Sequence, residues 1–234
     1  MHKIVAIDGP AGSGKGTVAD LVSKECNLVN IDTGATYRSV ALKALQNNVI
    51  DDENAIIEIS KNIDIKFTPD KKVFLDGVDV TDEIRSKEVT KIVSQVSSIV
   101  EVRKNLVELQ KKMAGDNDCI MEGRDITTVV FPNAKYKFYL DATPEERARR
   151  RFEQNKEKNI DMTYEEILEN IKMRDYNDSH KEVGSLTRTD EQIYIDSTNL
   201  TIPEVVKIIT DFVIGDELYE YYRFIFKIFW EKRT

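Results

Sequence analysis

A glycine-rich segment near the start of the chain has the residue order of a phosphate-binding loop. It follows the apolar run Ile4 to Ile7 and reads Gly9-Pro10-Ala11-Gly12-Ser13-Gly14-Lys15-Gly16-Thr17. Glycines let backbone N–H groups turn toward a polyphosphate, and the start of the helix predicted to follow adds partial positive charge. Lys15 supplies a full charge near the β- and γ-phosphates. Because strand, loop and helix come in the required order, we expect a nucleotide site rather than a glycine-rich turn with a solvent-facing lysine.

The same loop predicts how a magnesium ion is held. Gly16 stands where Ser or Thr usually follows the lysine, and Thr17 comes one place later. The hydroxyl that usually contacts Mg²⁺ is then missing from its place, so we expect phosphates and water to bind the ion. Cys26 and Cys119 show no metal-ligand spacing with either histidine. We therefore expect no protein metal site, and two reduced thiols that serve packing.

Arginines are expected near this loop, because phosphoryl transfer needs positive charge around a highly charged transition state. Arg38 and Arg124 each follow a predicted strand, at the sheet edge where doubly wound folds bind nucleotides. We expect both to contact phosphates rather than to be surface residues. The guanine-reading motif Asn-Lys-x-Asp does not occur in the sequence, which disfavours a GTP-driven switch.

Two further basic regions are candidates for contacts with ATP. Arg174, Asp178 and Lys181 fall at spacings that bring them onto one helix face. Arg151 ends a dense basic run, in which Arg149 and Arg150 fit a solvated face equally well. We expect Arg174 and Arg151 to approach ATP from a mobile lid.

Short apolar runs alternate with helical patterns, which predicts an α/β fold with a parallel central sheet flanked by helices. The expected strands, short enough to be buried on both faces, are Ile4 to Ile7, Leu28 to Ile31, Cys119 to Met121, Lys137 to Leu140 and Ile193 to Ile195. Apolar periodicity predicts helices over Lys15 to Lys24, Val100 to Met113 and Pro203 to Val213.

Two local signals add detail to this framework. In Thr143-Pro144-Glu145-Glu146, Thr143 is a candidate cap and Glu146 would complete a capping box, so a helix should begin at Pro144. Apolar alternation within 63–85, with a turn at Asp76-Gly77, predicts a small antiparallel insertion.

Composition narrows the class of protein further. The chain has 234 residues, 41% hydrophobic and 32% charged, which fits an ordinary globular domain. A net charge of −8 disfavours a protein that grips nucleic acid, because such proteins need a basic footprint. The first residues lack the basic start, apolar stretch and cleavage site of a signal peptide, so we expect a cytoplasmic protein.

The C-terminal segment is unusual in its aromatic content. The stretch from Tyr219 to Trp230 is interrupted by Arg223 and Lys227, and falls short of the roughly 20 apolar residues of a spanning helix. We expect no transmembrane segment. Two interpretations stay open for this segment: a helix packed on the core or on a partner, and an aromatic and basic element at a membrane surface.

Several motifs together resemble a known family. In chain order they are Gly9 to Thr17, Asp32 to Arg38, Ile84-Arg85, Ser94-Gln95-Val96, Val102-Arg103, Glu122 to Asp125 with Val129 to Pro132, and Ile195 to Thr198. The pattern resembles the bacterial cytidylate kinases, and it extends from Met1 to about Val213. The resemblance implies the P-loop nucleoside monophosphate kinase fold and direct in-line transfer of phosphate from ATP to CMP or dCMP.

The resemblance also implies a domain plan and a set of site residues. A single kinase domain would span 1–214, with an NMP-binding insertion near 63–85, a lid near 151–161 and an extension over 215–234, and we expect a monomer. The implied catalytic residues are Lys15, Arg124, Arg174 and Lys181. The implied ATP-binding residues are Gly9 to Thr17 and Arg151. The implied CMP-binding residues are Thr33, Tyr37, Arg38, Ser94, Arg103, Arg124, Asp125, Arg174 and Asp178.

Three of these residues match positions that read the cytosine ring, namely Ser94, Arg103 and Asp125. The chemistry agrees, because cytosine offers an amino donor at N4 beside acceptors at N3 and O2, which a carboxylate and a guanidinium complement. Uracil would leave buried groups unpaired, at a cost of about 1–3 kcal/mol each. We therefore predict discrimination against UMP.

The sequence departs from the family pattern at a few positions. Glu122 stands where aspartate is usual, Thr127 where glycine is usual, and Lys181 where arginine is usual, which removes a planar fork for phosphates. Gly184-Ser185 replaces a Ser-Pro pair. Two alternatives are weighed against CMP phosphorylation: a UMP/CMP or AMP kinase, which Asp125 and Arg103 disfavour, and an ATP-hydrolysing P-loop protein that regulates a partner.

Overall fold

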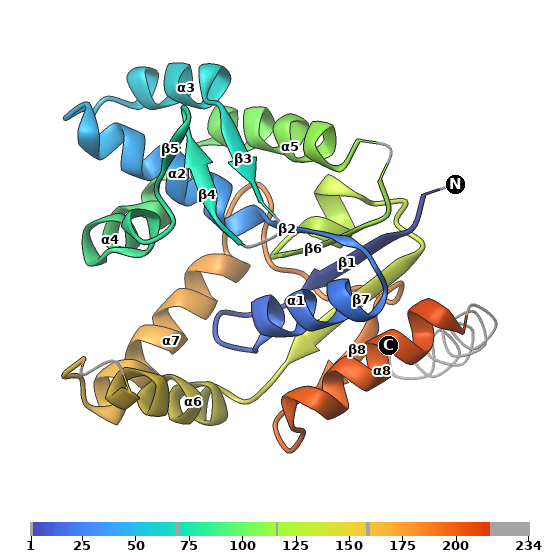
Figure 1. Ribbon diagram of the computed structural model, residues 1–234. Helices are drawn as coiled ribbons and strands as arrows, with labels where there is room; N and C mark the ends of the chain where they lie inside the picture. Colours follow the sequence, from blue (N-terminus) through green and yellow to red (C-terminus); the bar gives the residue numbers. More distant parts are fainter. Residues whose placement is uncertain (1, 69–70, 116, 158–159, 216–234) are drawn as a thin grey trace. The chain divides into compact units, whose positions relative to one another are not determined.

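The computed structural model describes residues 2–68, 71–115, 117–157 and 160–215, and Figure 1 shows the course of the chain. The chain divides into two compact units: the first is Met1–Asn30 with Asn117–Thr234, and the second is Ile31–Asp116. The aromatic segment predicted from Tyr219 to Trp230 lies outside the described residues. In the described part of the chain, no helix is both long and apolar enough to span a membrane.

A five-stranded sheet with the order β2-β6-β1-β7-β8 organises the first unit. β1 (Ile4–Asp8) pairs in parallel with β6 (Cys119–Gly123) and with β7 (Tyr136–Asp141), which pairs in parallel with β8 (Ile193–Asp196). β2 (Val29–Asp32) is the opposite edge strand. All the predicted strands are confirmed, with ends shifted by about one or two residues, as is usual for strand boundaries. The predicted fold class is therefore confirmed.

Helices cover this sheet because its strands are apolar on both faces. α1 (Lys15–Glu25) packs against α8 (Ile202–Ile214), and the two are seen side by side in Figure 1. α6 (Pro144–Glu157) packs against α7 (Tyr164–Ser179). The predicted helix starts at Lys15 and Pro144 are confirmed. The region predicted as a lid, 151–161, falls on the C-terminal part of α6 and the connection to α7, in which residues 158–159 are not described.

The core of the first unit is formed by the central strands and the two helices on them. Val5, Ile7, Phe138 and Leu140 are fully buried, and the ring of Phe138 lies 6.0 Å from that of Phe212 on α8. Burial of such side chains stabilises the fold by about 1.5–3 kcal/mol each. This packing fixes the carboxyl ends of the strands, from which the loops of the site begin.

Both cysteines are free thiols in this unit, as predicted. Cys119 is buried at the start of β6, and burial raises its pKa to about 11. Cys26, which follows α1, is half-buried, and burial likewise raises its pKa. Both are therefore protonated at neutral pH, which suits their predicted role in packing.

The second unit consists of helices and a small antiparallel sheet. Its elements are α2 (Thr33–Gln46), α3 (Glu53–Asn62), β3 (Ile65–Phe67), β4 (Val73–Leu75), β5 (Val78–Asp79), the 3₁₀ turn η1 (Glu83–Arg85), α4 (Lys87–Val96) and α5 (Val100–Ala114). The sheet has the order β3-β4-β5, which confirms the predicted antiparallel insertion. Its second turn has φ of 50° at Asp76 and 83° at Gly77, the left-handed conformation typical of tight hairpins. Val102 and Leu106 of α5 are fully buried, as their helical spacing predicts.

Candidate nucleotide-binding site

The glycine-rich loop connects β1 to α1 and needs glycine at particular positions. Gly9 has φ of 152°, and a Cβ there would lie 2.0 Å from the carbonyl oxygen of Leu140. Gly12 and Gly14 have φ of 81° and 91°, in the left-handed region that other residues rarely adopt. The loop backbone thus has the close approach and the positive φ values that let N–H groups point at an anion.

Side chains from two helices lie against this loop. The guanidinium of Arg147 on α6 donates to the carbonyl oxygen of Ala11 at 3.0 Å, and it forms a bidentate ion pair with Asp175 of α7. A Cβ at Gly14 would lie 3.2 Å from the Cδ1 atom of Ile202, at the start of α8. Arg147 is 3% exposed, so it supports the loop rather than a solvated face. Sequence reasoning did not single it out from the basic run.

Lys15 is buried inside the loop. Its Nζ donates to the carbonyl oxygen of Pro10 at 2.8 Å and to Oγ of Ser13 at 3.3 Å. Burial lowers the pKa of Lys15 to about 7, and the nearby charge of Arg124 acts in the same direction. An anionic phosphate would favour the charged form and reverse this shift.

A cluster of charged side chains surrounds Lys15 within the first unit. The Nε of Arg124 donates to Asp178 at 2.7 Å, and Nζ of Lys181 lies 3.2 Å from the other carboxylate oxygen. Burial alone would raise the pKa of Asp178, but Arg124 and Lys181 outweigh it and hold this pKa below its ordinary value. Arg174 is exposed on α7, and its charge also acts on Lys15. The structure therefore brings together all four residues of the predicted catalytic set.

Arg151 differs from the other predicted ATP contacts. It is exposed on α6, and its side chain makes no hydrogen bond or ion pair with another residue in the described part of the chain. Its neighbour Arg150 makes the structural contacts of this region, donating to the carbonyl and hydroxyl oxygens of Ser197. The predicted contact between Arg151 and ATP remains a prediction.

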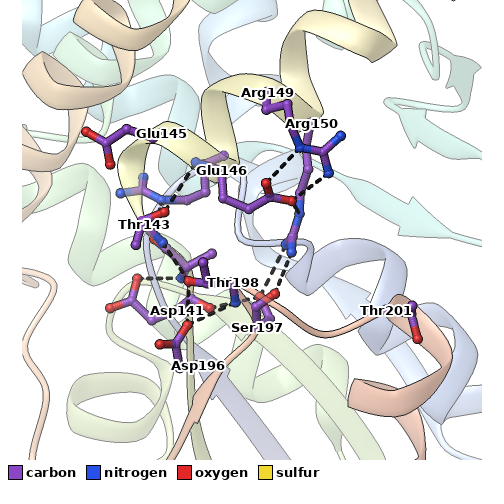
Figure 2. Close-up of polar contacts among 12 residues, drawn as sticks. Asp141, Thr143, Glu145, Glu146, Arg149, Arg150, Asp196, Ser197, Thr198 and Thr201 are labelled. Atoms are coloured by element: carbon purple, nitrogen blue, oxygen red, sulfur yellow. Dashed lines mark hydrogen bonds and ion pairs between the residues drawn. The ribbon is translucent and has the colours of Figure 1, made fainter.

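Figure 2 shows how Arg150 joins the start of α6 to the segment after β8. The carboxylate of Glu146 accepts hydrogen bonds from Arg149 and Arg150, and chiefly the bond from Arg149 lowers its pKa to about 2. The predicted capping box is therefore only half right. The hydroxyl of Thr143 accepts the hydrogen bond from the N–H of Glu146, as predicted. The N–H of Thr143, however, donates to Oγ1 of Thr198, because the carboxylate of Glu146 is held by the two arginines.

A buried polar cluster that the sequence did not reveal lies where β1 ends. The carboxylate of Asp8 accepts hydrogen bonds from the N–H of Ile126 at 2.8 Å, and from the N–H and hydroxyl of Thr127 at 2.9 and 2.5 Å. Nε2 of Gln192 donates to the same hydroxyl at 2.5 Å. Asp125, predicted to read cytosine, precedes this turn and is 5% exposed. Burial raises the pKa of Asp8, and the hydrogen bonds from Thr127 and Ile126 oppose this.

The second unit holds the other predicted CMP-binding residues on or beside α2. Arg38 donates through Nη1 to the carbonyl oxygen of Ile84 at 3.1 Å and to the hydroxyl of Thr90 at 3.0 Å. Thr33 is the first residue of α2 and is buried, and Asp32 caps the helix. These contacts hold the guanidinium of Arg38 against η1 and α4.

Arg103, Tyr37 and Ser94 are grouped by contacts around the end of α4. Arg103 is 4% exposed and donates to the carbonyl oxygen of Ser97 at 3.1 Å, while its guanidinium lies 5.4 Å from the ring centre of Tyr37. Ser94 is exposed, and its carbonyl oxygen accepts a hydrogen bond from Oγ of Ser97. The structure thus brings these three predicted residues together within one unit.

The described residues contain no group of three or more His, Cys, Asp or Glu able to hold a metal ion. One carboxylate nevertheless lies beside the loop. A Cβ at Gly16 would lie 3.6 Å from Oε1 of Glu122, so this carboxylate lies next to the place where the usual Ser or Thr side chain would stand.

Comparisons with known proteins identify relatives of this chain. The family model described as cytidylate kinase matches residues 5–214. The cytidylate kinase of Fusobacterium nucleatum is 50% identical over 208 residues, covering 88% of this chain and 95% of the relative. That of Clostridium acetobutylicum is 46% identical over 214 residues, covering 91% and 98%.

Among solved structures, an uncharacterized protein from Eubacterium ventriosum superposes with a TM-score of 0.52 at 10% identity, covering 92% of this chain and 99% of that one. At this identity the likeness bears on the fold alone.

Proposed function

The chain belongs to the cytidylate kinase family, and from this we propose that it transfers the γ-phosphoryl group of ATP to CMP and dCMP. The observation that carries the proposal is a buried lysine inside a glycine-rich loop, with Arg124 held beside it by Asp178. Such an arrangement neutralises charge on phosphates that approach each other. Transfer is direct and in line, without a covalent enzyme intermediate.

The roles of the individual residues follow from their charge and support. Backbone N–H groups of the loop bind the triphosphate, and Lys15 binds near its β- and γ-phosphates. Arg124, Arg174 and Lys181 neutralise the transferring group, and Asp178 orients Arg124 and Lys181 through its two oxygens. Because Asp178 is buried, these cations keep a fixed direction before substrates bind.

Each residue predicted to bind CMP is assigned its role by itself. Arg38 binds the α-phosphate, with Thr33 and Tyr37 lining the same subsite. Arg103 and Ser94 donate hydrogen bonds to the ring acceptors of cytosine, and the carboxylate of Asp125 accepts from its N4 amino group. This pattern supports CMP over UMP, because uracil presents the opposite groups at two of these places.

The site suits Mg²⁺ bound through phosphates and water. Gly16 provides no hydroxyl, whereas the carboxylate of Glu122 lies beside that position and would accept hydrogen bonds from waters of the ion. When bound, Mg²⁺ supplies charge neutralisation of the β- and γ-phosphates.

The organisation of the whole protein is part of the proposal. The match to residues 5–214 supports one kinase domain over 1–214, with an insertion near 63–85 and a lid near 151–161. We place the activity in the cytoplasm, where ATP and CMP are found, and in a monomer. The extension over 215–234 lies outside the matched range and contacts either a protein partner or a membrane surface.

A coupled assay of ADP formation tests the proposal directly. With ATP and Mg²⁺ present, ADP formation is measured with CMP, dCMP, UMP, AMP or GMP as acceptor and with no acceptor. We expect rapid turnover with CMP and dCMP and much slower turnover with UMP. Turnover with AMP alone would contradict the acceptor assignment, and ADP formation independent of acceptor would point to a regulatory ATPase.

A further inference from the structure

The buried carboxylate of Asp8 has no part in the reaction described above, yet it joins two parts of the first unit that the reaction needs. We infer that Asp8 and Thr127 are positioning residues, which fix the phosphate loop relative to Asp125. This inference rests on the proposed function, because Asp125 is assigned there to the cytosine of CMP. It deepens that proposal by naming the contact that sets donor and acceptor subsites in register.

The contacts of Asp8 are directional on both oxygens. One carboxylate oxygen accepts a hydrogen bond from the N–H of Ile126 at 2.8 Å, and the other accepts from the N–H and the hydroxyl of Thr127 and, at 3.5 Å, from Nε2 of Gln192. Asp8 is fully buried and Thr127 is 3% exposed, so water does not compete for these bonds. A carboxylate that accepts several hydrogen bonds in a low dielectric is held in one orientation.

On one side, the carboxylate is attached to the phosphate loop. The next residue is Gly9, whose backbone passes so close to Leu140 that a Cβ would lie 2.0 Å from the carbonyl oxygen. Such a tight contact leaves the backbone of Gly9 no room to compensate for a shift of Asp8. Movement of the Asp8 backbone would therefore pass into the loop.

On the other side, the same carboxylate is bonded to the turn that begins directly after Asp125. The carbonyl oxygen of Asp125 accepts hydrogen bonds from Val129 and Val130, and the following N–H groups are those bound by Asp8. Asp125 is therefore held from both sides of its peptide. The Asp8 contact thereby helps to fix the backbone from which the Asp125 side chain begins.

Thr127 completes the contact in a way that the usual glycine does not. Its hydroxyl donates to Asp8 and accepts from Nε2 of Gln192, so the orientation of the hydroxyl is fixed from both ends. Gln192 in turn accepts from the N–H of Thr189 at 2.7 Å. The segment before β8 thereby stabilises the contact that joins the phosphate loop to the turn after Asp125.

Three variants test this inference in the full-length protein. Thr127→Val removes the hydroxyl but keeps the shape and the backbone N–H, and Thr127→Ser is its matched control with the hydroxyl retained. Asp8→Asn is the stronger change, because either orientation of the amide places an NH₂ group against a backbone N–H donor. Folding is monitored by thermal unfolding, and ATP and CMP binding are each measured alone by calorimetry.

We expect kcat with both nucleotides saturating to fall about tenfold in Thr127→Val and up to about 100-fold in Asp8→Asn, as for misplacement of reacting groups by about 1 Å. Affinity for ATP alone should change less than about threefold, and Thr127→Ser should restore kcat. A role in stability alone would lower the unfolding temperature without changing kcat below it.

Two outcomes would overturn the inference. Both are measured on the Thr127 variants, so the test still decides if the Asp8→Asn protein does not fold. One is a folded Thr127→Val protein with kcat within about twofold of the parent. The other is a loss of kcat that Thr127→Ser shares. Failure of the proposed function is distinguishable, because the parent protein would then form no ADP in response to CMP.

Discussion

The two units of the molecule hold their cationic side chains in different ways. In the first unit, Arg124 and Lys181 share the buried carboxylate of Asp178. In the second unit, Arg38 and Arg103 are anchored on the backbone carbonyl oxygens of Ile84 and Ser97. An ion pair with a carboxylate holds a cationic side chain where negative charge develops during phosphoryl transfer. A hydrogen bond to a backbone carbonyl oxygen orients a guanidinium without neutralising its positive charge. We infer that the cations of the first unit act chiefly on turnover, whereas those of the second unit act chiefly on recognition of CMP.

The largest effect should come from the lysine of the loop. Lys15→Met removes the charge nearest the transferring phosphate, and kcat should fall about 10²–10³-fold, as for loss of one preorganised donor. Affinity for CMP alone should stay unchanged, because no CMP-reading residue is altered. Steady-state kinetics and CMP calorimetry measure the two quantities.

Lys24→Met is the matched control, since Lys24 lies on the same helix, is 62% exposed and pairs with Asp20. It should leave kcat unchanged. A Lys15→Met enzyme that lost CMP affinity as strongly as turnover would break the division between the two units.

The next effect concerns the ion pair of the first unit. Arg124→Met leaves Asp178, whose side chain is 7% exposed, without its closest partner, so stability should fall by about 3 kcal/mol and kcat by about 100-fold. Chemical denaturation and the coupled assay measure both. Arg149→Met, at a residue 60% exposed, should change stability by less than about 1 kcal/mol. Equal stability of the two variants would count against a structural ion pair at Arg124.

The second unit should respond through KM rather than kcat. Arg103→Ala removes a buried donor assigned to cytosine, and KM for CMP should rise about 10- to 100-fold while ATP affinity changes little. Lys104→Ala on the exposed face of the same helix is the control, because Lys104 is 63% exposed. Equal losses for ATP and CMP would contradict the role of Arg103.

The smallest effect is a proton taken up on binding. Burial lowers the pKa of Lys15 to about 7, so its amine is largely uncharged at pH 8 when no nucleotide is bound. Bound ATP should restore the proton on this amine. Calorimetry of ATP binding at pH 8 in two buffers of different ionisation enthalpy should show uptake of about one proton. The Lys15→Met protein should lack this uptake, and identical enthalpies in both buffers for the parent would refute it.

The same lowered pKa predicts how stability depends on pH without nucleotide. Between about pH 7 and 10.5 the unfolded chain binds the proton that the folded loop has released. The contribution of Lys15 to the free energy of unfolding therefore rises with pH across this window, and Lys15→Met should remove that part of the slope.

Local signals in the sequence predicted most of the framework. The strands, the helix starts at Lys15 and Pro144, and the antiparallel insertion depend on residues that lie close together in the chain. The phosphate loop was also predicted from neighbouring residues, because glycines in such a loop predict the positive φ values found at Gly12 and Gly14. The grouping of Arg124, Asp178 and Lys181 needed the family resemblance as well.

Contacts between distant residues could not be predicted in this way. Thr127 meets Asp8 across 119 positions, and Arg147 meets Asp175 across 28, and neither distance leaves a periodic pattern. The capping box failed for a related reason, because Glu146 had two arginines on its own helix that compete for its carboxylate. One hint of the Asp8 contact was present in the sequence, since Asp8 is a polar residue at the end of an apolar strand.

The state of the two thiols has a practical consequence for studying motion in this protein. Thiol reagents react with the thiolate, and the raised pKa values at Cys26 and Cys119 keep both sulfurs in the slow-reacting form at neutral pH. A cysteine introduced on the exposed side of α3, for example at Glu58, would therefore be labelled first by a fluorescent maleimide. Dye-based reporters of substrate-induced rearrangement can then be attached at one chosen point without first engineering out the native cysteines.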